Sequence, residues 1–241
     1  MSLFYVFFVF SVLSFCNASL WNLPPKSTAV VTGGTKGIGH AIVSELGLNF
    51  GCKILTCARN EEELNACIKV WQEKGCDVRG CVADVSTTEG RNKLMKEVED
   101  LIKGDCANPG QLDILVNNVG TNIRKPSIEY SEDDLEFVLQ TNFKSMFELT
   151  KLCHPYLKRD KVEGGSHCEH TSSVVNIGSV AGVVCMKSGT PYAATKAAMN
   201  QITGNWSCEW GPDGIRVNCV TPWYINTALA QQVLKNEDYK R

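Results

Sequence analysis

The chain has 241 residues, of which 44% are hydrophobic and 21% charged, and its formal net charge is −2. This length and composition suit one large globular domain with a substantial core. The near-neutral charge argues against nucleic acid as a partner, because proteins that bind nucleic acid usually carry a basic face.

Twelve cysteines are present, and they predict neither disulfides nor a metal site. Most of them lie in apolar runs and none forms a Cys-x-x-Cys pair, which is typical of free thiols in a reducing compartment. The cluster His167-Cys168-Glu169-His170 fits no standard zinc spacing. We therefore expect a cytoplasmic protein that binds no metal and does not associate with a membrane.

Residues 1–20 differ from the rest of the chain. The run Leu3 to Phe15 is apolar, and Cys16-Asn17-Ala18 after it resembles a signal-peptidase site. However, a secretory signal normally has Lys or Arg before its apolar run, and none precedes this one. The run is also short for crossing a bilayer. The alternatives are a targeting segment or anchor, and a misassigned first exon, which we favour. The domain proper is then expected at 21–241.

From Ser27 onward, short β-rich runs alternate with longer amphipathic stretches. The expected strands are Ala29–Thr32, Lys53–Cys57, Val78–Val82, Leu112–Val116, Ser173–Ile177 and Ile215–Val220. The expected helices between them are Gly39–Asn49, Glu61–Lys74, Thr87–Lys103, Asp133–Lys158 and Pro191–Glu209. This alternation predicts a single α/β domain of the Rossmann type, a doubly wound parallel sheet with helices on both faces.

A glycine-rich turn, Thr32-Gly-Gly-Thr-Lys-Gly-Ile-Gly39, joins the first strand to the first helix. In that context glycines allow the backbone to approach a pyrophosphate, whose charge is stabilised by the helix N-terminus. Taken alone, such a turn is as often a purely structural one. It therefore predicts a dinucleotide site only together with other signals.

The pair Tyr192 and Lys196 is the second signal. A Tyr-x-x-x-Lys spacing on a helix places both side chains on one face, one turn apart. An ammonium beside a phenol stabilises the phenolate, which makes Tyr192 a candidate general acid toward a ketone oxygen. The two signals together indicate a nicotinamide-dependent carbonyl reductase.

Taken together, the motifs resemble those of the short-chain dehydrogenase/reductase family. Thr32 to Gly39 matches the family's cofactor signature, and Asn117-Asn-Val-Gly120 resembles its Asn-Asn-Ala-Gly. Cys57-Ala-Arg-Asn60 and Pro222-Trp-Tyr-Ile-Asn-Thr227 are similar to the plant tropinone reductase-like branch. Most of the family has Pro-Gly where this chain has Pro222-Trp223, and tryptophan at that position is typical of this branch.

The resemblance implies roles for individual residues. Asn142 would support a water relay, Ser179 would orient the substrate carbonyl, and Tyr192 and Lys196 complete the catalytic set. The implied cofactor-binding residues are Gly33, Thr35, Lys36, Gly37, Ile38, Gly39, Arg59, Asp84, Val85, Asn118, Gly120, Tyr192, Lys196, Pro222, Ile225 and Thr227. Trp223 and Tyr224 are candidates for the pocket wall.

The charges near the second strand favour NADP(H) over NAD. A chain that prefers NAD usually carries Asp or Glu at the end of this strand. Here Arg59 follows the strand, and Lys36 lies in the glycine turn, so two cations are available for a 2′-phosphate. The alternative is that both merely cap a solvated edge.

Departures from the family leave a second function open. Gly178 stands where this branch commonly has a serine, and relatives continue past Arg241 through a helical lid to a final strand. We therefore expect a C-terminally truncated domain lacking the last strand, with an incomplete surface for the family's usual homo-oligomer. The predicted function is NADPH-dependent reduction of a small ketone. The alternative is a weak or inactive paralogue that binds nucleotide or partner chains.

The motifs do not specify the substrate. The segments 121–123 and 182–191 are expected to face the pocket, and neither contains a carboxylate that would bind a protonated amine. A tropane alkaloid is therefore not favoured over small apolar ketones or terpenoid carbonyls. The stereochemistry of the product is not encoded in any motif.

Overall fold

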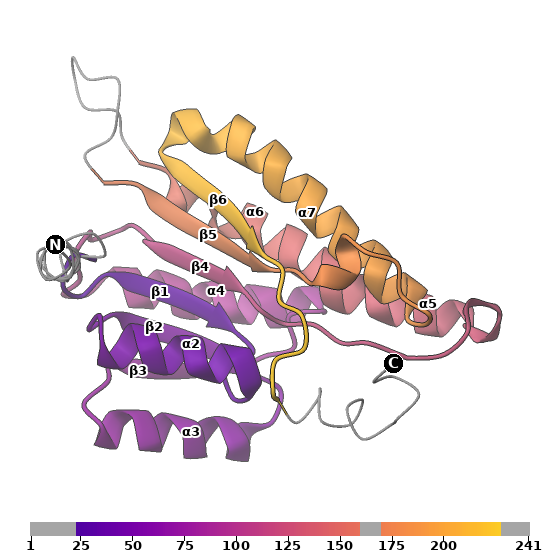
Figure 1. Ribbon diagram of the computed structural model, residues 1–241. Helices are drawn as coiled ribbons and strands as arrows, with labels where there is room; N and C mark the ends of the chain where they lie inside the picture. The colour runs from indigo at the N-terminus through magenta and orange to yellow at the C-terminus, as the bar shows by residue number, and fades with distance from the viewer. Residues whose placement is uncertain (1–22, 160–169, 228–241) are drawn as a thin grey trace, which may run out of the picture.

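The computed structural model describes residues 23–159 and 170–227 (Figure 1). Six parallel strands form one sheet in the order β3-β2-β1-β4-β5-β6. Their bounds are β1 Thr28–Thr32, β2 Lys53–Ala58, β3 Val78–Val82, β4 Ile114–Asn117, β5 Ser172–Ile177 and β6 Ile215–Val220. The predicted doubly wound parallel sheet is confirmed.

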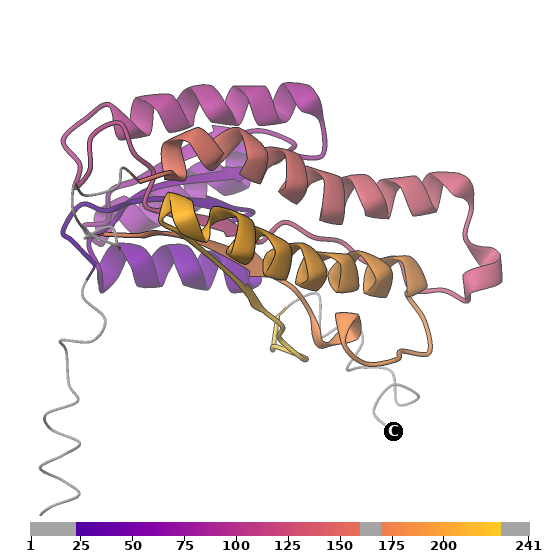
Figure 2. The same ribbon diagram turned by 90° about the horizontal axis from the view of Figure 1, so that it is seen from above.

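Helices cover both faces of this sheet because successive strand residues point to opposite sides. Val30 of β1 packs in one buried cluster with α4, α6 and α7, whereas its neighbours Ala29 and Val31 pack in another with α2 and α3. The bounds are α2 Gly37–Leu48, α3 Glu61–Glu73, α4 Thr88–Ile102, α6 Ser145–Leu157 and α7 Thr190–Trp210. The two apolar clusters therefore fix the layers seen in Figure 2.

The helix expected at Asp133–Lys158 is interrupted by a π turn. Its parts are α5 Glu132–Leu139, the π turn η2 Gln140–Lys144, and α6. The Ser145 N–H accordingly bonds to the carbonyl of Gln140, five residues back. Figure 2 shows α5 and α6 as one continuous rod beside α7, so the π turn changes the register of the rod without breaking it.

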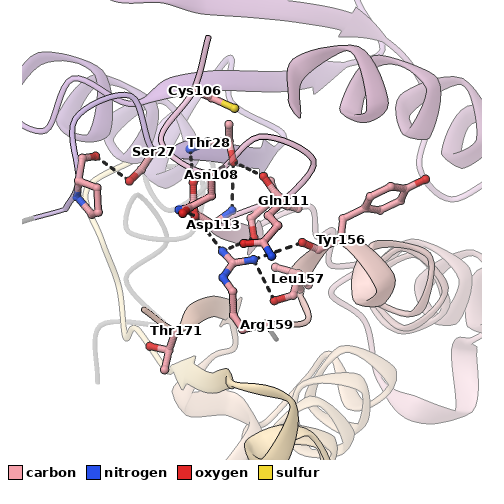
Figure 3. A network of polar contacts seen from close by, with 12 residues as sticks. Ser27, Thr28, Cys106, Asn108, Gln111, Asp113, Tyr156, Leu157, Arg159 and Thr171 are labelled. Atoms are coloured by element: carbon pink, nitrogen blue, oxygen red, sulfur yellow. Dashed lines mark hydrogen bonds and ion pairs between the residues drawn. The ribbon is translucent and has the colours of Figure 1, made fainter. Parts of the chain in front are cut away.

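The strand order reverses between β1 and β4, and such a switch point is where α/β proteins bind ligands. The turns after all six strands lie at the same edge of the sheet, since the strands are parallel. The opposite edge is closed by a buried polar network (Figure 3).

That network is centred on Asp113, which lies just before β4. Its carboxylate accepts hydrogen bonds from the Thr28 N–H at 2.7 Å and from Asn108 Nδ2 at 2.7 Å. Arg159, after α6, donates from Nη2 to Asp113 Oδ1 at 2.8 Å and to the Leu112 carbonyl at 3.0 Å. This buried ion pair ties the starts of β1 and β4 to the end of α6, far from the turns at the other edge.

Several expectations fall on residues that the structure leaves undescribed. The apolar leader at 1–20, most of the His167–His170 cluster and the chain after Thr227 lie outside the described residues. Within 23–159 and 170–227, all cysteines are free thiols and no group of three metal-binding side chains occurs. Across the same two ranges, no helix is long and apolar enough to cross a membrane.

Candidate active site

A cleft of about 940 Å³ runs along the carboxyl edge of the sheet. The turns that follow all six strands contribute to its walls. Of the predicted site residues, those lining it are Gly33, Thr35, Lys36, Gly37, Ile38, Arg59, Asp84, Val85, Asn118, Gly120, Ser179, Tyr192, Lys196, Pro222, Ile225 and Thr227. Only Gly39 and Asn142 among the predicted residues stand behind this lining.

The turn after β1 needs its glycines. Gly33 and Gly37 have φ values of +70° and +56°, which side chains other than glycine rarely adopt. A Cβ on Gly39 would lie 2.3 Å from the carbonyl oxygen of Gly33, so the turn folds too tightly there for any other residue. The Asn118 side chain, after β4, donates to the carbonyls of Thr32 and Gly33 at 2.9 and 3.1 Å. The turn is thereby fixed to the next strand.

The N-terminus of α2 faces this cleft without a cap. The Lys36 side chain makes no capping hydrogen bond, and the first turn of α2 holds no acidic residue. By contrast, α3, α4 and α5 are each capped by a side chain, from Asn60, Thr87 and Ser131. The N–H groups and positive dipole end of α2 are therefore oriented toward an anion in the cleft. Together with the bare glycines, they fit the pyrophosphate of a dinucleotide.

Both predicted cations lie in the cleft, and each one faces a carboxylate. Lys36 Nζ is 2.7 Å from Glu63 Oε1, and Arg59 Nη1 is 4.0 Å from Asp84 Oδ2. The lysine and arginine side chains are 71% and 69% exposed, so both can reach a ligand. Glu63 also lines the cleft. No motif of the sequence marks Glu63, and its pairing with Lys36 depends on the fold.

Tyr192 and Lys196 lie one turn apart on α7, as the spacing predicts. The Lys196 side chain is buried, with 3% of its residue surface exposed, and its Nζ donates to the Ile177 carbonyl at 2.6 Å. This Nζ is 5.7 Å from the centre of the Tyr192 ring. Burial lowers the pKa of Lys196 to about 8. The ammonium is thus available beside the phenol, but in a poorly solvated place.

Ser179 faces the same part of the cleft from the end of β5. Its hydroxyl accepts a hydrogen bond from the Ala181 N–H at 3.1 Å, which caps the short 3-10 turn η3 Val180–Gly182. Gly182 then packs directly on α7, because a Cβ there would lie 2.6 Å from the Lys196 carbonyl carbon. This close backbone contact sets the position of Ser179 relative to the tyrosine and the lysine.

Asn142 lies in the π turn and is fully buried. Its Oδ1 accepts from the Thr121 N–H at 2.7 Å, while its Nδ2 donates to the Thr121 carbonyl at 2.9 Å and to Thr195 Oγ1 at 3.1 Å. Thr195 in turn donates to the Tyr192 carbonyl. The amide is therefore occupied by protein partners, and it joins the turn after β4 to the helix that carries the tyrosine.

The end of the cleft beyond Ser179 combines apolar side chains with neutral polar ones, such as Asn122 and Ser188, and with one cation. Phe137, Met186 and Trp223 are exposed apolar side chains that line it, with the Tyr224 ring 4.9 Å from that of Trp223. Trp223 and Tyr224 lie in the wall as predicted. Arg124 also lines this end. Arg124 and Phe137 lie in no recognised sequence motif, and only the fold brings them to the cleft.

Comparison with known proteins shows the same family at the levels of sequence and structure. Residues 27–238 match the family described as short chain dehydrogenase. Two tropinone reductase homologs of Arabidopsis thaliana are 47% and 46% identical. Their alignments cover 91% and 90% of this chain, and 76% and 75% of the relatives.

Solved structures share the fold at lower identity. A putative short-chain alcohol dehydrogenase from Sinorhizobium meliloti 1021 superposes with a TM-score of 0.77 at 26% identity, covering 92% of this chain and 81% of that one. A variant of actinorhodin polyketide ketoreductase with NADPH gives 0.75 at 30% identity, covering 87% and 75%. The chain therefore belongs to the short chain dehydrogenase family of nicotinamide-dependent oxidoreductases and is tropinone reductase-like within it.

Proposed function

We propose that the protein is an NADPH-dependent reductase of small ketones. The observation that carries this proposal is that Tyr192, Lys196 and Ser179 meet in one cleft. The other end of that cleft has an uncapped helix N-terminus and two exposed cations. A cleft with these two ends accommodates a dinucleotide phosphate along the sheet edge and a carbonyl compound beside the tyrosine.

The reaction needs a hydride and a proton. When bound, the nicotinamide cofactor supplies the hydride that reduces the carbonyl carbon to an alcohol. The Tyr192 hydroxyl donates the proton to the carbonyl oxygen, and the Ser179 hydroxyl orients that oxygen by a hydrogen bond. Lys196 stabilises the phenolate that remains on the tyrosine. Asn142 acts through Thr195 and Thr121, by holding the tyrosine helix against the turn after β4.

NADPH rather than NADH is proposed because of the charges at the far end of the cleft. Lys36 and Arg59 are both long, exposed cations that line it. An adenosine 2′-phosphate would offer them a dianionic partner, and arginine in particular suits the planar recognition of phosphate. The homologous ketoreductase that was crystallised with NADPH supports this choice. We infer a cytoplasmic, reducing setting from the free thiols among the described residues.

Replacing the Tyr192 hydroxyl tests the proposal. Tyr192→Phe should lower ketone-dependent NADPH oxidation by at least about a hundredfold, as expected for loss of a general acid. Binding of NADPH, followed by its fluorescence, should change by no more than a factor of about two, which corresponds to less than about 0.5 kcal/mol of binding free energy. Tyr156→Phe is the matched control, because that hydroxyl bonds to Glu99 outside the cleft.

Two results would contradict the proposal. Substantial turnover by Tyr192→Phe would remove the tyrosine from the chemistry. A wild-type protein that binds NADPH and reduces no member of a broad ketone panel would instead favour the alternative, a nucleotide-binding paralogue without turnover.

A further inference from the structure

Arg124 is a cation at the substrate end of the cleft, and no carboxylate of the described residues pairs with it. It is half-buried and lines the cleft together with apolar side chains and neutral polar ones such as Asn122. All the other charged groups of the lining except Lys196 belong to the cofactor end, where Lys36 and Arg59 face Glu63 and Asp84. A half-buried guanidinium without a carboxylate partner can form a strong, charge-assisted pair with an anionic ligand.

The residues on either side of Arg124 are fixed in place. Tyr130 donates from its hydroxyl to the Ile123 carbonyl, and Lys125 forms an ion pair with Asp134 near the start of α5. The Lys125 Nζ also lies 5.1 Å from the centre of the Tyr130 ring. The pairing within this stretch is therefore selective: Asp134 neutralises Lys125, and Arg124 is left for the cleft.

The same stretch is also anchored to the catalytic helix. Thr121, three residues earlier, is bound through both backbone groups to Asn142. Ser127, three residues later, shares a 2.7 Å hydrogen bond with Thr190 at the start of α7. Arg124 is thus presented from a segment held at both ends, which is the way proteins preorganise a binding group.

From this arrangement we propose that the substrate is an apolar ketone that carries an anionic group, a carboxylate in the simplest case, bound by Arg124. The proposal rests on the proposed ketone reduction and specifies its substrate class. The ketone oxygen lies at Ser179 and Tyr192, the apolar body lies against Phe137, Met186 and Trp223, and the anion meets the guanidinium. A carboxylate matches the paired donors of arginine, whereas a protonated amine would be repelled.

Matched acids and esters test this assignment. Benzoylpropionate, benzoylbutyrate and benzoylvalerate place a carboxylate at increasing distances from an aryl ketone, and their methyl esters remove the charge while keeping the skeleton. For the chain length that fits best, wild-type kcat/KM should favour the acid by about tenfold, the usual strength of a charge-assisted hydrogen bond. Arg124→Gln should bring this ratio close to one, and Arg124→Lys should retain part of it.

The control and a second measurement keep the test decisive. Arg79→Gln removes an exposed cation of β3 outside the cleft and should leave the acid-to-ester ratio unchanged. Dissociation constants of the same acids and esters for the protein loaded with NADP+, which has no hydride to transfer, repeat the comparison without turnover; quenching of tryptophan fluorescence measures them, since Trp223 lines the cleft. If no ketone is reduced, the proposed function fails, while an acid preference in binding that Arg124→Gln abolishes still supports the role of Arg124. Equal binding and turnover of acid and ester by the wild type would overturn it.

Discussion

Lys196 is predicted to destabilise the fold that contains it, and replacing it by methionine should make the empty protein more stable near neutral pH. The side chain is buried, and this burial lowers its pKa from 10.5 to about 8. Methionine has a similar length and needs no hydration. Lys196→Met should therefore relieve the cost of a buried ammonium while abolishing activity.

The magnitude follows from the pKa. A drop from 10.5 to about 8 means that holding the charged form in the folded state costs about 3 kcal/mol near pH 7. The mutation also removes the hydrogen bond from Nζ to the Ile177 carbonyl. Losing it costs about 1 kcal/mol, because this residue borders the cleft and water can replace the donor. The expected net gain is about 2 kcal/mol, or about 4 to 8 °C in Tm for a domain of this size.

The sign of the pH dependence makes the prediction specific. Between about pH 8 and 10.5 the native lysine is mostly neutral, whereas the unfolded one is still charged. The unfolded state then binds more protons, so wild-type stability rises with pH through this window. The advantage of Lys196→Met should accordingly shrink to near zero by about pH 9.5.

Urea and thermal unfolding without cofactor, at about pH 7 and about pH 9.5, measure the effect. Lys151→Met, at an exposed lysine of α6 that pairs with Glu148, is the control and should follow the wild type at both values. A stability difference between Lys196→Met and wild type that is the same at both pH values would refute the reasoning. So would a less stable mutant near pH 7.

Two further predictions concern the carboxylates that face cations. Glu63→Gln should tighten NADPH binding by about two- to fivefold and leave NADH binding unchanged, because Lys36 no longer has to leave its carboxylate partner to bind the 2′-phosphate. Titration of both cofactors measures this, and equal changes in the two affinities would contradict it. Arg159→Met should lower the free energy of unfolding by about 3 to 5 kcal/mol, because Asp113 stays buried without its guanidinium. In urea unfolding, Asp113→Asn combined with Arg159→Met should recover part of that loss, and a double mutant as unstable as the sum of the single ones would argue against a coupled pair.

The sheet could be predicted from the sequence because its signals are local. Alternating strand and helix patterns predict the layers, and the glycines at 33, 37 and 39 mark the turn by their spacing alone. The predicted residues Ser179, Tyr192 and Lys196 do line one cleft, while their roles in catalysis stay predictions.

Features that depend on contacts between distant segments could not be predicted. Lys36 and Glu63 are 27 residues apart and meet only because α3 returns along the sheet. Arg124 lies in an ordinary loop sequence, and its importance depends on which neighbours are already paired. The π turn has no marker either, since Gln140-Thr-Asn-Phe-Lys144 contains neither glycine nor proline. Within it, Asn142 bonds to Thr121 and Thr195, which are distant from it in the sequence.

The π turn has a consequence for how this protein can change in length. One π turn is equivalent to a single inserted residue in an otherwise regular α-helix. Deleting one residue between Leu139 and Ser145 would restore a regular helix, but it would rotate α5 by about 100° relative to α6. Phe137 would then leave the cleft wall. Asp134 would lose its ion pair with Lys125 in the loop after β4. The rod beside α7 should therefore tolerate many substitutions on its outer face and no change in residue number, so its length is as much a part of the substrate pocket as any side chain.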